Sequence, residues 1–229
     1  MESVVIFTGA GISAESGLDT FRDLGGLWGK YKIEDVATQE AFEKNPKIVL
    51  DFYNNRRRKL LSALPNDAHI ALNKLQKKYN LVVITQNIDD LHERSGTKNV
   101  IHLHGKLTES RSTLDNVVYK INGAELNVDD NCEKGYQLRP NVVWFGEEVP
   151  NMDFAIEKVK AADIFIIIGT SLKVFPAASL IRYAKNSKRI ILIDPNVTSY
   201  EGIEVITDRA TQAVPKLVDE LLKRSYSIT

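Results

Sequence analysis

Runs of apolar, mostly β-branched residues recur along the chain, and within each run neighbouring positions are both apolar. The runs lie at residues 4–7, 81–85, 100–103, 164–168, 190–193 and 204–206. Such runs are typical of strands that a parallel sheet buries on both faces. Half-exposed antiparallel strands would instead alternate apolar and polar positions.

Helix-like stretches separate these runs. Residues 46–64 begin with a proline, which suits a first helical turn. Asp67 can cap a helix that carries Ala68, Leu72 and Leu75. Further candidates are residues 152–161, 176–186 and 211–224. Strands that alternate with helices predict an α/β fold, a Rossmann-like parallel sheet with helices on both faces.

Two segments interrupt the alternation, and we expect them to form a smaller lobe over the sheet. Residues 23–64 would be a helical insertion, and residues 106–140 a polar one. In the second, Asn122-Gly123 between two short β-like runs predicts a hairpin, because both residues tolerate positive φ. The sheet lobe of this single domain would use residues 1–22, 65–105 and 141–229. A ligand cleft is expected between lobe and sheet, beyond the carboxyl ends of the strands.

Composition narrows the possible functions. The 30 basic and 30 acidic residues cancel, so net charge favours neither nucleic acid nor an anionic membrane as a partner. Cys132 is the only cysteine, which excludes an internal disulfide and a multi-cysteine zinc site. No run approaches the roughly 18 apolar residues of a membrane helix, and the start lacks a basic signal-peptide region. We expect a cytoplasmic protein of open oligomeric state, with a monomer favoured.

A glycine-rich turn follows the first apolar run. Its sequence GAGISA, from Gly9 through Ala10, Gly11 and Ser13 to Ala14, satisfies the pattern G-x-G-x-x-G/A of dinucleotide-binding turns. Gly9 would allow the tight turn, Gly11 the approach of a pyrophosphate, and Ala14 close helix packing. A tight strand–helix turn without a ligand would look similar. No second strand ending in an acid follows about 20 residues later, so the cofactor pose differs from that of a dehydrogenase.

Polar side chains follow two further strands. Gln86, Asn87 and Asp89 come directly after residues 81–85, where ligands sit, although they could simply cap the next turn. Asp90 and His92 are predicted at a helix start and on the surface. His104 ends another apolar run and is a candidate general base, because imidazole titrates near neutral pH; a structural histidine is the alternative.

His102 and His104 are two residues apart, so a metal site is considered. No cysteine or nearby acid completes it, and we predict no metal. Two later strand ends offer more polar groups. Gly169, Thr170 and Ser171 carry donors suited to ribose or phosphate, or form an ordinary strand–helix loop. Asp194 is the acid best placed for a ribose hydroxyl.

These motifs together resemble those of the sirtuins over essentially the whole chain. GAGISAESGLDTFR, TQNID, LHG, RPNVVWFGE and GTSLKVFPA occur in the order of that family. The resemblance implies an enzyme that consumes NAD to remove acyl groups from lysine side chains of proteins. The acyl oxygen attacks the ribose carbon that carries nicotinamide, a histidine then activates a ribose hydroxyl, and the acyl group ends on ADP-ribose.

The resemblance also implies roles for individual residues. His104 would be the base, Asn87 would position the ribose, and Asp89 would bind the nicotinamide amide. Phe21 and Arg22 would lie over the cofactor, Ser13 would touch it, and Ala210 would contact adenine. The extended stretch that includes Val143, Phe145 and Gly146 would pair with the backbone of the substrate peptide.

A further motif bears on the acyl group. Tyr53 and Arg56 have the Y-x-x-R spacing of the sirtuin subclass that removes succinyl and similar acidic groups. At i, i+3 on a helix the two side chains share a face, and arginine can bind a carboxylate bidentately. The alternative is a solvated basic face, because Arg56, Arg57 and Arg58 are consecutive.

The chain departs from most sirtuins at their four-cysteine zinc module. The four ligand positions fall on or near Ser112, Asp115, Asn131 and Lys134, with Cys132 beside one of them. These groups do not suit zinc, and we expect the Asn122-Gly123 hairpin to organise this segment instead. The alternatives to a deacylase are an NAD-binding regulatory module without catalysis and a Rossmann oxidoreductase, which the missing acid disfavours.

Overall fold

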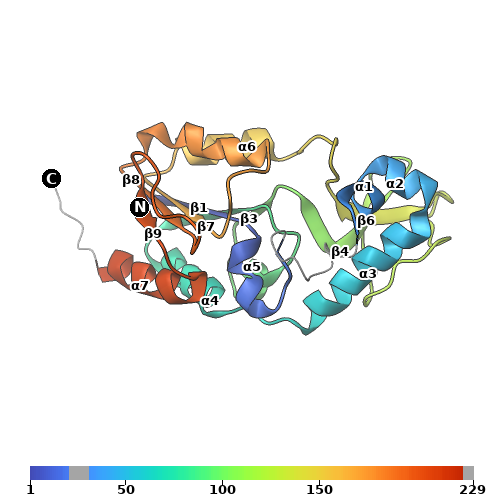
Figure 1. Ribbon diagram of the computed structural model, residues 1–229, viewed down its shortest axis with the longest axis horizontal. Coiled ribbons are helices and arrows are strands. Elements are labelled where there is room, and N and C mark those ends of the chain that lie inside the picture. Colours follow the sequence, from blue (N-terminus) through green and yellow to red (C-terminus); the bar gives the residue numbers. More distant parts are fainter. Residues whose placement is uncertain (21–30, 224–229) are drawn as a thin grey trace.

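The computed structural model describes residues 1–20 and 31–223 and shows two lobes side by side (Figure 1). The larger lobe is built on a six-stranded sheet in the order β3-β2-β1-β7-β8-β9, and the smaller on a three-stranded sheet in the order β5-β4-β6. Every strand pair of the large sheet is parallel. The predicted Rossmann-like architecture is confirmed.

The six strands of the large sheet lie where the apolar runs predicted them. They are β1 (Ser3–Thr8), β2 (Asn80–Thr85), β3 (Val100–His102), β7 (Ile164–Ile168), β8 (Arg189–Ile193) and β9 (Glu204–Ile206). Strand order runs outward from β1 to β3 on one side and from β7 to β9 on the other. The direction of winding therefore reverses between β1 and β7, which is where such sheets bind ligands.

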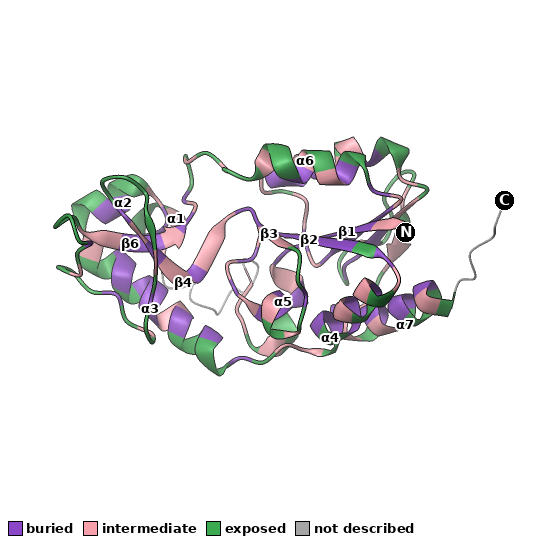
Figure 2. Ribbon diagram, turned by 180° about the vertical axis from the view of Figure 1, so that it is seen from behind, coloured by how far each residue is buried: buried purple, intermediate pink, exposed green. Residues whose placement is uncertain are grey.

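Helices cover both faces of this sheet, as predicted. On one face of the sheet, strand side chains pack against α4 (Asp67–Lys74) and α7 (Ala210–Lys223). On the other face, the remaining strand side chains pack against α6 (Met152–Lys160) and η5 (Ala177–Asn186). Their buried sides turn toward the sheet in Figure 2. Shorter helical turns are η1 (Ala10–Ile12), η2 (Ala14–Ser16), η4 (Leu75–Lys77) and α5 (Leu91–Arg94).

The small lobe has its own apolar core. It combines α1 (Ile33–Val36), α2 (Gln39–Lys44) and α3 (Pro46–Ser62) with β4 (Gly105–Ser112), β5 (Val118–Lys120) and β6 (Leu138–Val142). Phe52, Tyr53, Leu107 and Trp144 are buried in this core. Segments as far as 91 residues apart in the sequence thus share one core, which places one side of α3 along the cavity.

The hairpin predicted at Asn122-Gly123 is wrong. β5 pairs with β4, and no strand follows Gly123 until β6. The reason lies on α3, because the Asn54 side chain exchanges two hydrogen bonds of 3.0 Å with the backbone of Leu126 and the Arg57 guanidinium donates to the carbonyl of Ala124 at 2.7 Å. These side chains take the backbone groups that a second hairpin strand would have used.

Three smaller predictions also need correction. Asn66 rather than Asp67 caps α4, with its side chain accepting from the Ala68 N–H. Residues 177–186 form a 3₁₀ segment with a kink at Ala184 rather than an α-helix. His92, predicted on the surface, is buried under the sheet. The predicted end of the last helix, Arg224, lies outside the described residues.

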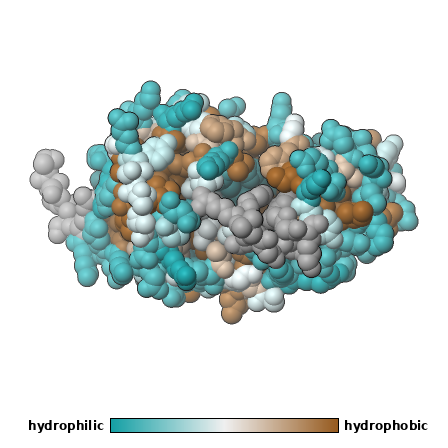
Figure 3. Space-filling view, viewed as in Figure 1, coloured by the Kyte–Doolittle hydropathy of each residue, from teal (hydrophilic) through white to brown (hydrophobic). Residues whose placement is uncertain are grey.

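None of the helices in the described ranges has the length and apolar character needed to cross a bilayer. The face of the molecule in Figure 3 is mostly hydrophilic, with apolar residues in separate patches.

The loops after β1 and β7 touch through glycine backbones. The Gly9 N–H donates to Ile168 O at 3.0 Å, and the Gly11 N–H donates to Gly169 O at 2.9 Å. A Cβ on Gly11 would lie 2.7 Å from the Gly169 Cα, and one on Gly169 would lie 2.5 Å from the Ile12 nitrogen. The glycines are thus required by loop–loop contact, a reason the sequence did not show. Ala14, predicted to pack against a helix, is exposed.

Two buried histidines lie beneath the ends of β1 and β2. The rings of His69 and His92 are 4.9 Å apart, edge to face, and His92 Nε2 lies 3.1 Å from the Thr8 hydroxyl. Burial lowers the pKa of His69 to about 4. Burial, and then the neighbouring His69, lower the pKa of His92. Both rings are therefore neutral in the folded protein at neutral pH.

Replacing Gly169 by alanine should destabilise the fold by about 3 kcal/mol, because it adds a left-handed backbone penalty to overlap with the Gly11–Ile12 backbone. Gly202→Ala is the matched control. Gly202 has a similar φ of +70° but nothing within 4 Å of a Cβ, so its cost should stay near 1 kcal/mol. Urea unfolding of both variants measures the difference, and equal losses would contradict the steric argument.

Acid should weaken the fold before carboxylates titrate. The unfolded chain protonates His69 near pH 6.5, whereas the folded chain resists until about pH 4. Stability from the neutral ring is therefore complete above pH 6.5 and declines as the pH falls toward 4, by on the order of 3 kcal/mol. Urea unfolding between pH 7.5 and 4.5 tests this. His69→Phe should make the slope shallower, with His92 and His104 contributing the remainder, and an unchanged slope would refute the assignment.

Candidate active site

The polar residues that follow the strands meet because the strands end at one level. Thr8 pairs with both Thr85 and Ile168, and Ile168 pairs with Ile193. The next residues, Gly9, Gln86, Gly169 and Asp194, therefore form one rim of the sheet. The small lobe stands opposite this rim.

A cavity of about 580 Å³ lies between the rim and the small lobe. The sheet lobe lines it with Gly9, Ala10, Gly11, Ser13, Gln86, Asn87, Asp89, His104, Gly169, Thr170, Ser171, Asp194 and Ala210. Helix α3 of the small lobe and the segment after β6 contribute Tyr53, Arg56, Val143, Phe145 and Gly146. Phe21 and Arg22 lie outside the described residues, and every other predicted site residue lines this one cavity.

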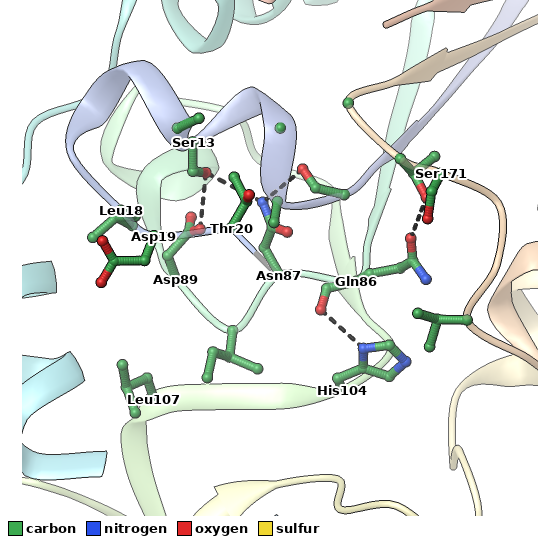
Figure 4. A pocket seen from close by; sticks show the side chains of 18 of the residues that line it. Ser13, Leu18, Asp19, Thr20, Gln86, Asn87, Asp89, His104, Leu107 and Ser171 are labelled. Atoms are coloured by element: carbon green, nitrogen blue, oxygen red, sulfur yellow. Dashed lines mark hydrogen bonds between the residues drawn. The ribbon is translucent and has the colours of Figure 1, made fainter. Parts of the chain in front are cut away.

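Asn87 is held by hydrogen bonds at the floor of the cavity. Its amide nitrogen donates to Gly9 O and to the Ser13 hydroxyl, both at 3.2 Å. Its backbone N–H donates to the Thr85 hydroxyl at 3.0 Å. These bonds use both amide hydrogens, so the amide oxygen is the atom left to face a ligand. Figure 4 shows Asn87 between Ser13 and Gln86.

Asp89 lies beside it and is buried. Its carboxylate accepts from the Ser13 hydroxyl at 2.9 Å and from the Leu91 N–H at 3.1 Å. Burial raises the pKa of Asp89 and outweighs these two hydrogen bonds, which lower it. A carboxyl group in this state has unused lone pairs that could accept from an amide N–H. Ser13 thus connects Asn87 and Asp89, a link that the glycine motif alone did not predict.

His104 points toward the cavity from the loop after β3 (Figure 4). Its Nδ1 lies 2.9 Å from the carbonyl oxygen of Gln86, which accepts only and so requires a proton on Nδ1. Burial lowers the pKa of His104, partly offset by this hydrogen bond. The ring is therefore neutral near pH 7, with the Nε2 lone pair available, which is the state a general base needs.

The predicted donors at residues 169–171 are partly used within the protein. The Gly169 N–H donates to Ile193 O at 2.9 Å, and the Thr170 hydroxyl donates to Gln86 Oε1 at 2.9 Å. Ser171 is left as the candidate hydroxyl for a ligand. Asp194 is buried at the end of β8 and accepts from the Asn196 N–H at 2.8 Å. Its second carboxylate oxygen could accept from a ribose hydroxyl.

His102 is the last residue of β3, whereas His104 lies in the loop that follows. The side chains of the two histidines therefore line different hollows. His102 lines a second hollow with Lys106 and contacts Asn87 O at 3.1 Å and Glu93 Oε1 at 2.8 Å. The prediction that no acid lies nearby is therefore wrong. Burial would raise the pKa of Glu93, but the hydrogen bonds and charges of His102 and Lys106 outweigh burial and lower this pKa to about 2. In the described ranges no three metal-binding side chains converge on one point.

The three consecutive arginines of α3 diverge, so they do not form one solvated basic face. Arg56 lines the cavity with Tyr53. Arg57 is fully buried and donates to Leu107 O at 2.6 Å, and only the exposed Arg58 pairs with Glu125, at 2.7 Å. Burial lowers the pKa of Arg56, which Tyr53 and two acidic residues partly counter.

The segment that would hold zinc is organised by polar contacts. Lys134 and Asp115 form an ion pair of 2.7 Å, and the Ser112 hydroxyl lies 3.5 Å from the buried Cys132 sulfur. Asn131 forms an isolated bridge with Gln137. These contacts join the end of β4 to the segment before β6. They replace the Asn122-Gly123 hairpin as the local organiser.

Trp144 and Glu147 also line the cavity, although their motif in the sequence, RPNVVWFGE, indicated no role for either. The Trp144 indole donates to the Tyr53 hydroxyl at 3.0 Å, and Glu147 accepts from the Trp144 N–H at 2.7 Å. An aromatic residue after a strand is usual in any core, so only the fold reveals these contacts.

Comparison with known proteins agrees with this geometry. The Sir2 family matches residues 9–176. An NAD-dependent protein deacylase of Bacteroides thetaiotaomicron is 46% identical over 231 residues, covering 97% of this chain and 99% of that protein. One of Helicobacter pylori (strain J99) is 48% identical over 227 residues, covering 97% of each chain.

Solved structures agree as well. A Sir2 homologue in complex with NAD superposes with a TM-score of 0.88 at 42% identity, covering 96% of this chain and 90% of that one. A Sir2 homologue in complex with ADP-ribose gives a TM-score of 0.89 at 41% identity, covering 97% and 94%. With a shared fold, extensive identity and matching motifs around one cavity, the chain belongs to the Sir2 family.

Proposed function

We propose that this protein uses NAD to remove acyl groups from lysine side chains of proteins, with nicotinamide and O-acyl-ADP-ribose as products. The observation that carries the proposal is the neutral His104 in one cavity with the fixed amide of Asn87, at the point where the sheet reverses its winding. The related proteins bear the name NAD-dependent protein deacylase, and one similar solved structure is a Sir2–p53 peptide–NAD⁺ complex, at 29% identity and a TM-score of 0.80.

The groups lining the cavity fit a dinucleotide. Asp194 suits a ribose hydroxyl, Ser171 suits a ribose or a phosphate, and Ala210 opens α7 beside them, where adenine would lie. Buried Asp89 can accept from a carboxamide N–H, as the nicotinamide group requires. Bound NAD would supply a ribose carbon from which nicotinamide can leave. Dehydrogenases with this glycine motif usually carry an acidic residue at the end of a second strand about 20 residues later. The sequence has no such strand and acid, which argues against hydride transfer.

His104 would take a proton from a ribose hydroxyl at Nε2, with the Gln86 carbonyl fixing its tautomer. The Asn87 amide oxygen would orient the same sugar. Residues 143–146 would bind the peptide backbone: the Val143 N–H already donates to His104 O at 3.0 Å, which ties the peptide wall to the base.

Tyr53 and Arg56 would select the acyl group. They lie on the α3 side of the cavity, and an arginine whose pKa burial lowers still remains a cation at neutral pH. We propose succinyl or malonyl groups as preferred substrates, with acetyl groups also accepted. The Tyr53 hydroxyl, whose pKa burial raises to about 12, would donate to the terminal carboxylate.

The alternative is an NAD-binding regulatory module with weak or no catalysis. Such a module would bind NAD without releasing nicotinamide from it. Nicotinamide release that depends on an acyl-lysine peptide supports the enzyme, and NAD binding without such release supports the module.

His104→Ala should reduce acyl-lysine-dependent nicotinamide release by about 10²–10⁴-fold, because the ribose hydroxyl loses its base. The affinity for NAD, measured by calorimetry, should change little, since the ring contributes a lone pair rather than a binding charge. Turnover close to that of the wild type would remove His104 from the mechanism. A parallel loss of NAD affinity would make it a binding residue instead.

Arg56→Met should lower kcat/KM for a succinyl-lysine peptide by about 100-fold and for an acetyl-lysine peptide far less, since only succinyl carries a carboxylate. Arg58→Met is the matched control on the same helix. Arg58 is exposed and pairs with Glu125, so its replacement should alter neither substrate's turnover. Equal losses on both peptides in the Arg56 variant would argue against acidic-acyl recognition.

A further inference from the structure

Trp144 lines the cavity together with Tyr53, and the only polar atom of its side chain contacts the Tyr53 hydroxyl. Its indole Nε1 is 3.0 Å from the Tyr53 hydroxyl oxygen, and both residues are buried. An indole N–H can only donate, so the Tyr53 oxygen must accept. The direction of this hydrogen bond is therefore fixed by chemistry.

That direction determines what the Tyr53 hydroxyl can offer a ligand. A phenol has one proton and two acceptor positions, and the indole occupies one of the acceptor positions. The hydroxyl proton must then point away from Trp144. Within residues 1–20 and 31–223 no hydrogen bond from this hydroxyl to another protein group is formed. Since Tyr53 lines the cavity, its proton is available to an acceptor inside it.

The hydroxyl also stays protonated. Burial raises the pKa of Tyr53 to about 12, although nearby Arg56 lowers it. A donor that cannot ionise, beside the cation Arg56, presents one O–H and one guanidinium to the same ligand. This pair suits a carboxylate, which only accepts, and offers an acetyl methyl group nothing.

Trp144 itself is fixed by a partly buried cluster of charges. The Arg139 guanidinium carbon lies 3.4 Å from the centre of the indole ring, and Arg139 pairs with Glu147 at 2.6 Å. Arg111 pairs with the same carboxylate at 3.0 Å, and Glu147 accepts from the Trp144 backbone N–H. Burial would raise the pKa of Glu147, but these arginines and the N–H outweigh it, so the group remains a carboxylate.

We infer that Trp144 is a positioning residue for acyl selectivity. Its N–H orients the Tyr53 hydroxyl as a donor toward the terminal carboxylate of an acidic acyl-lysine, and the Arg111–Glu147–Arg139 cluster fixes the indole in that position. The inference rests on the proposed deacylase function. A purely structural tryptophan would need its ring here, but not an N–H directed at the one tyrosine of the acyl pocket.

Trp144→Phe retains an aromatic ring over Arg139 and removes the N–H. We expect kcat/KM for a succinyl-lysine peptide to fall by about tenfold, as for the loss of one hydrogen bond at a charged partner. For an acetyl-lysine peptide the fall should be much smaller, so the ratio of the two changes. Phe42→Leu is the control, because Phe42 packs on Trp144 at 5.4 Å without a polar contact and should lower both rates alike.

A double-mutant cycle with Tyr53→Phe shows whether Trp144 acts through Tyr53. Once the hydroxyl is absent, Trp144→Phe should have little further effect on the succinyl-to-acetyl ratio. Additive effects, or equal losses on both peptides, would overturn the inference. If Trp144→Phe does not fold, benzothienylalanine at position 144 supplies the ring shape without the N–H, and it should give the same altered ratio.

Failure of the inference and failure of the proposed function give different results. If the wild-type protein releases no nicotinamide with any acyl-lysine peptide, the deacylase proposal fails and the inference with it. If the wild type favours succinyl-lysine and Tyr53→Phe abolishes that preference while Trp144→Phe leaves it intact, the function stands and only the role of Trp144 is refuted.

Discussion

The close contact between the loops after β1 and β7 is the constraint on which the site depends. The two strands are neighbours at the point where the sheet reverses its winding, and the backbone hydrogen bond from Gly11 to Gly169 closes the gap between their loops. Side chains at these positions would separate the loops and fill the floor of the cavity. Strand register then brings Gln86 and Asp194 to the same rim, so one alignment assembles residues from four strands.

Burial shifts the pKa values of two ionisable groups of the site in opposite directions. It lowers the pKa of His104 and raises that of Asp89, so both groups are shifted toward their neutral forms. The Ser13 hydroxyl links Asp89 to the Asn87 amide, and the Gln86 carbonyl fixes the His104 tautomer. The imidazole and the amide are thus fixed before any ligand enters, and in the proposed reaction this order would reduce the reorganisation that the chemical step requires.

Helix α3 belongs to the core of the small lobe and also lines the cavity. Its buried side chains Asn54 and Arg57 hold the backbone of the polar insertion, while Tyr53 and Arg56 reach the cavity from the same helix. The insertion that lacks zinc ligands is thereby anchored through arginine and asparagine side chains. Neighbouring residues of one helix thus hold the small lobe together and line the cavity.

The sequence by itself predicted the six strands of the large sheet, because strands enclosed by helices on both faces appear as continuous apolar runs. It also indicated His104, Asn87 and Asp89 as candidate site residues, since polar groups directly after such strands lie at the rim of the sheet, and all three line the cavity. Predictions from short sequence motifs were wrong where contacts with distant residues compete with the local preference. The turn at Asn122-Gly123 formed no hairpin because Asn54 and Arg57, about 70 residues away, take its backbone partners.

Other features were decided only by the folded structure. Three consecutive arginines look alike in the sequence, yet helical geometry sends Arg56 to the cavity, Arg57 to the core and Arg58 to solvent. Gly169 is required because the backbone of a distant loop lies against it. The Trp144 indole likewise donates to the Tyr53 hydroxyl only because folding brings the two segments together. Sequence patterns indicate which segments are buried, whereas the hydrogen bonds of a side chain depend on segments that only folding brings together.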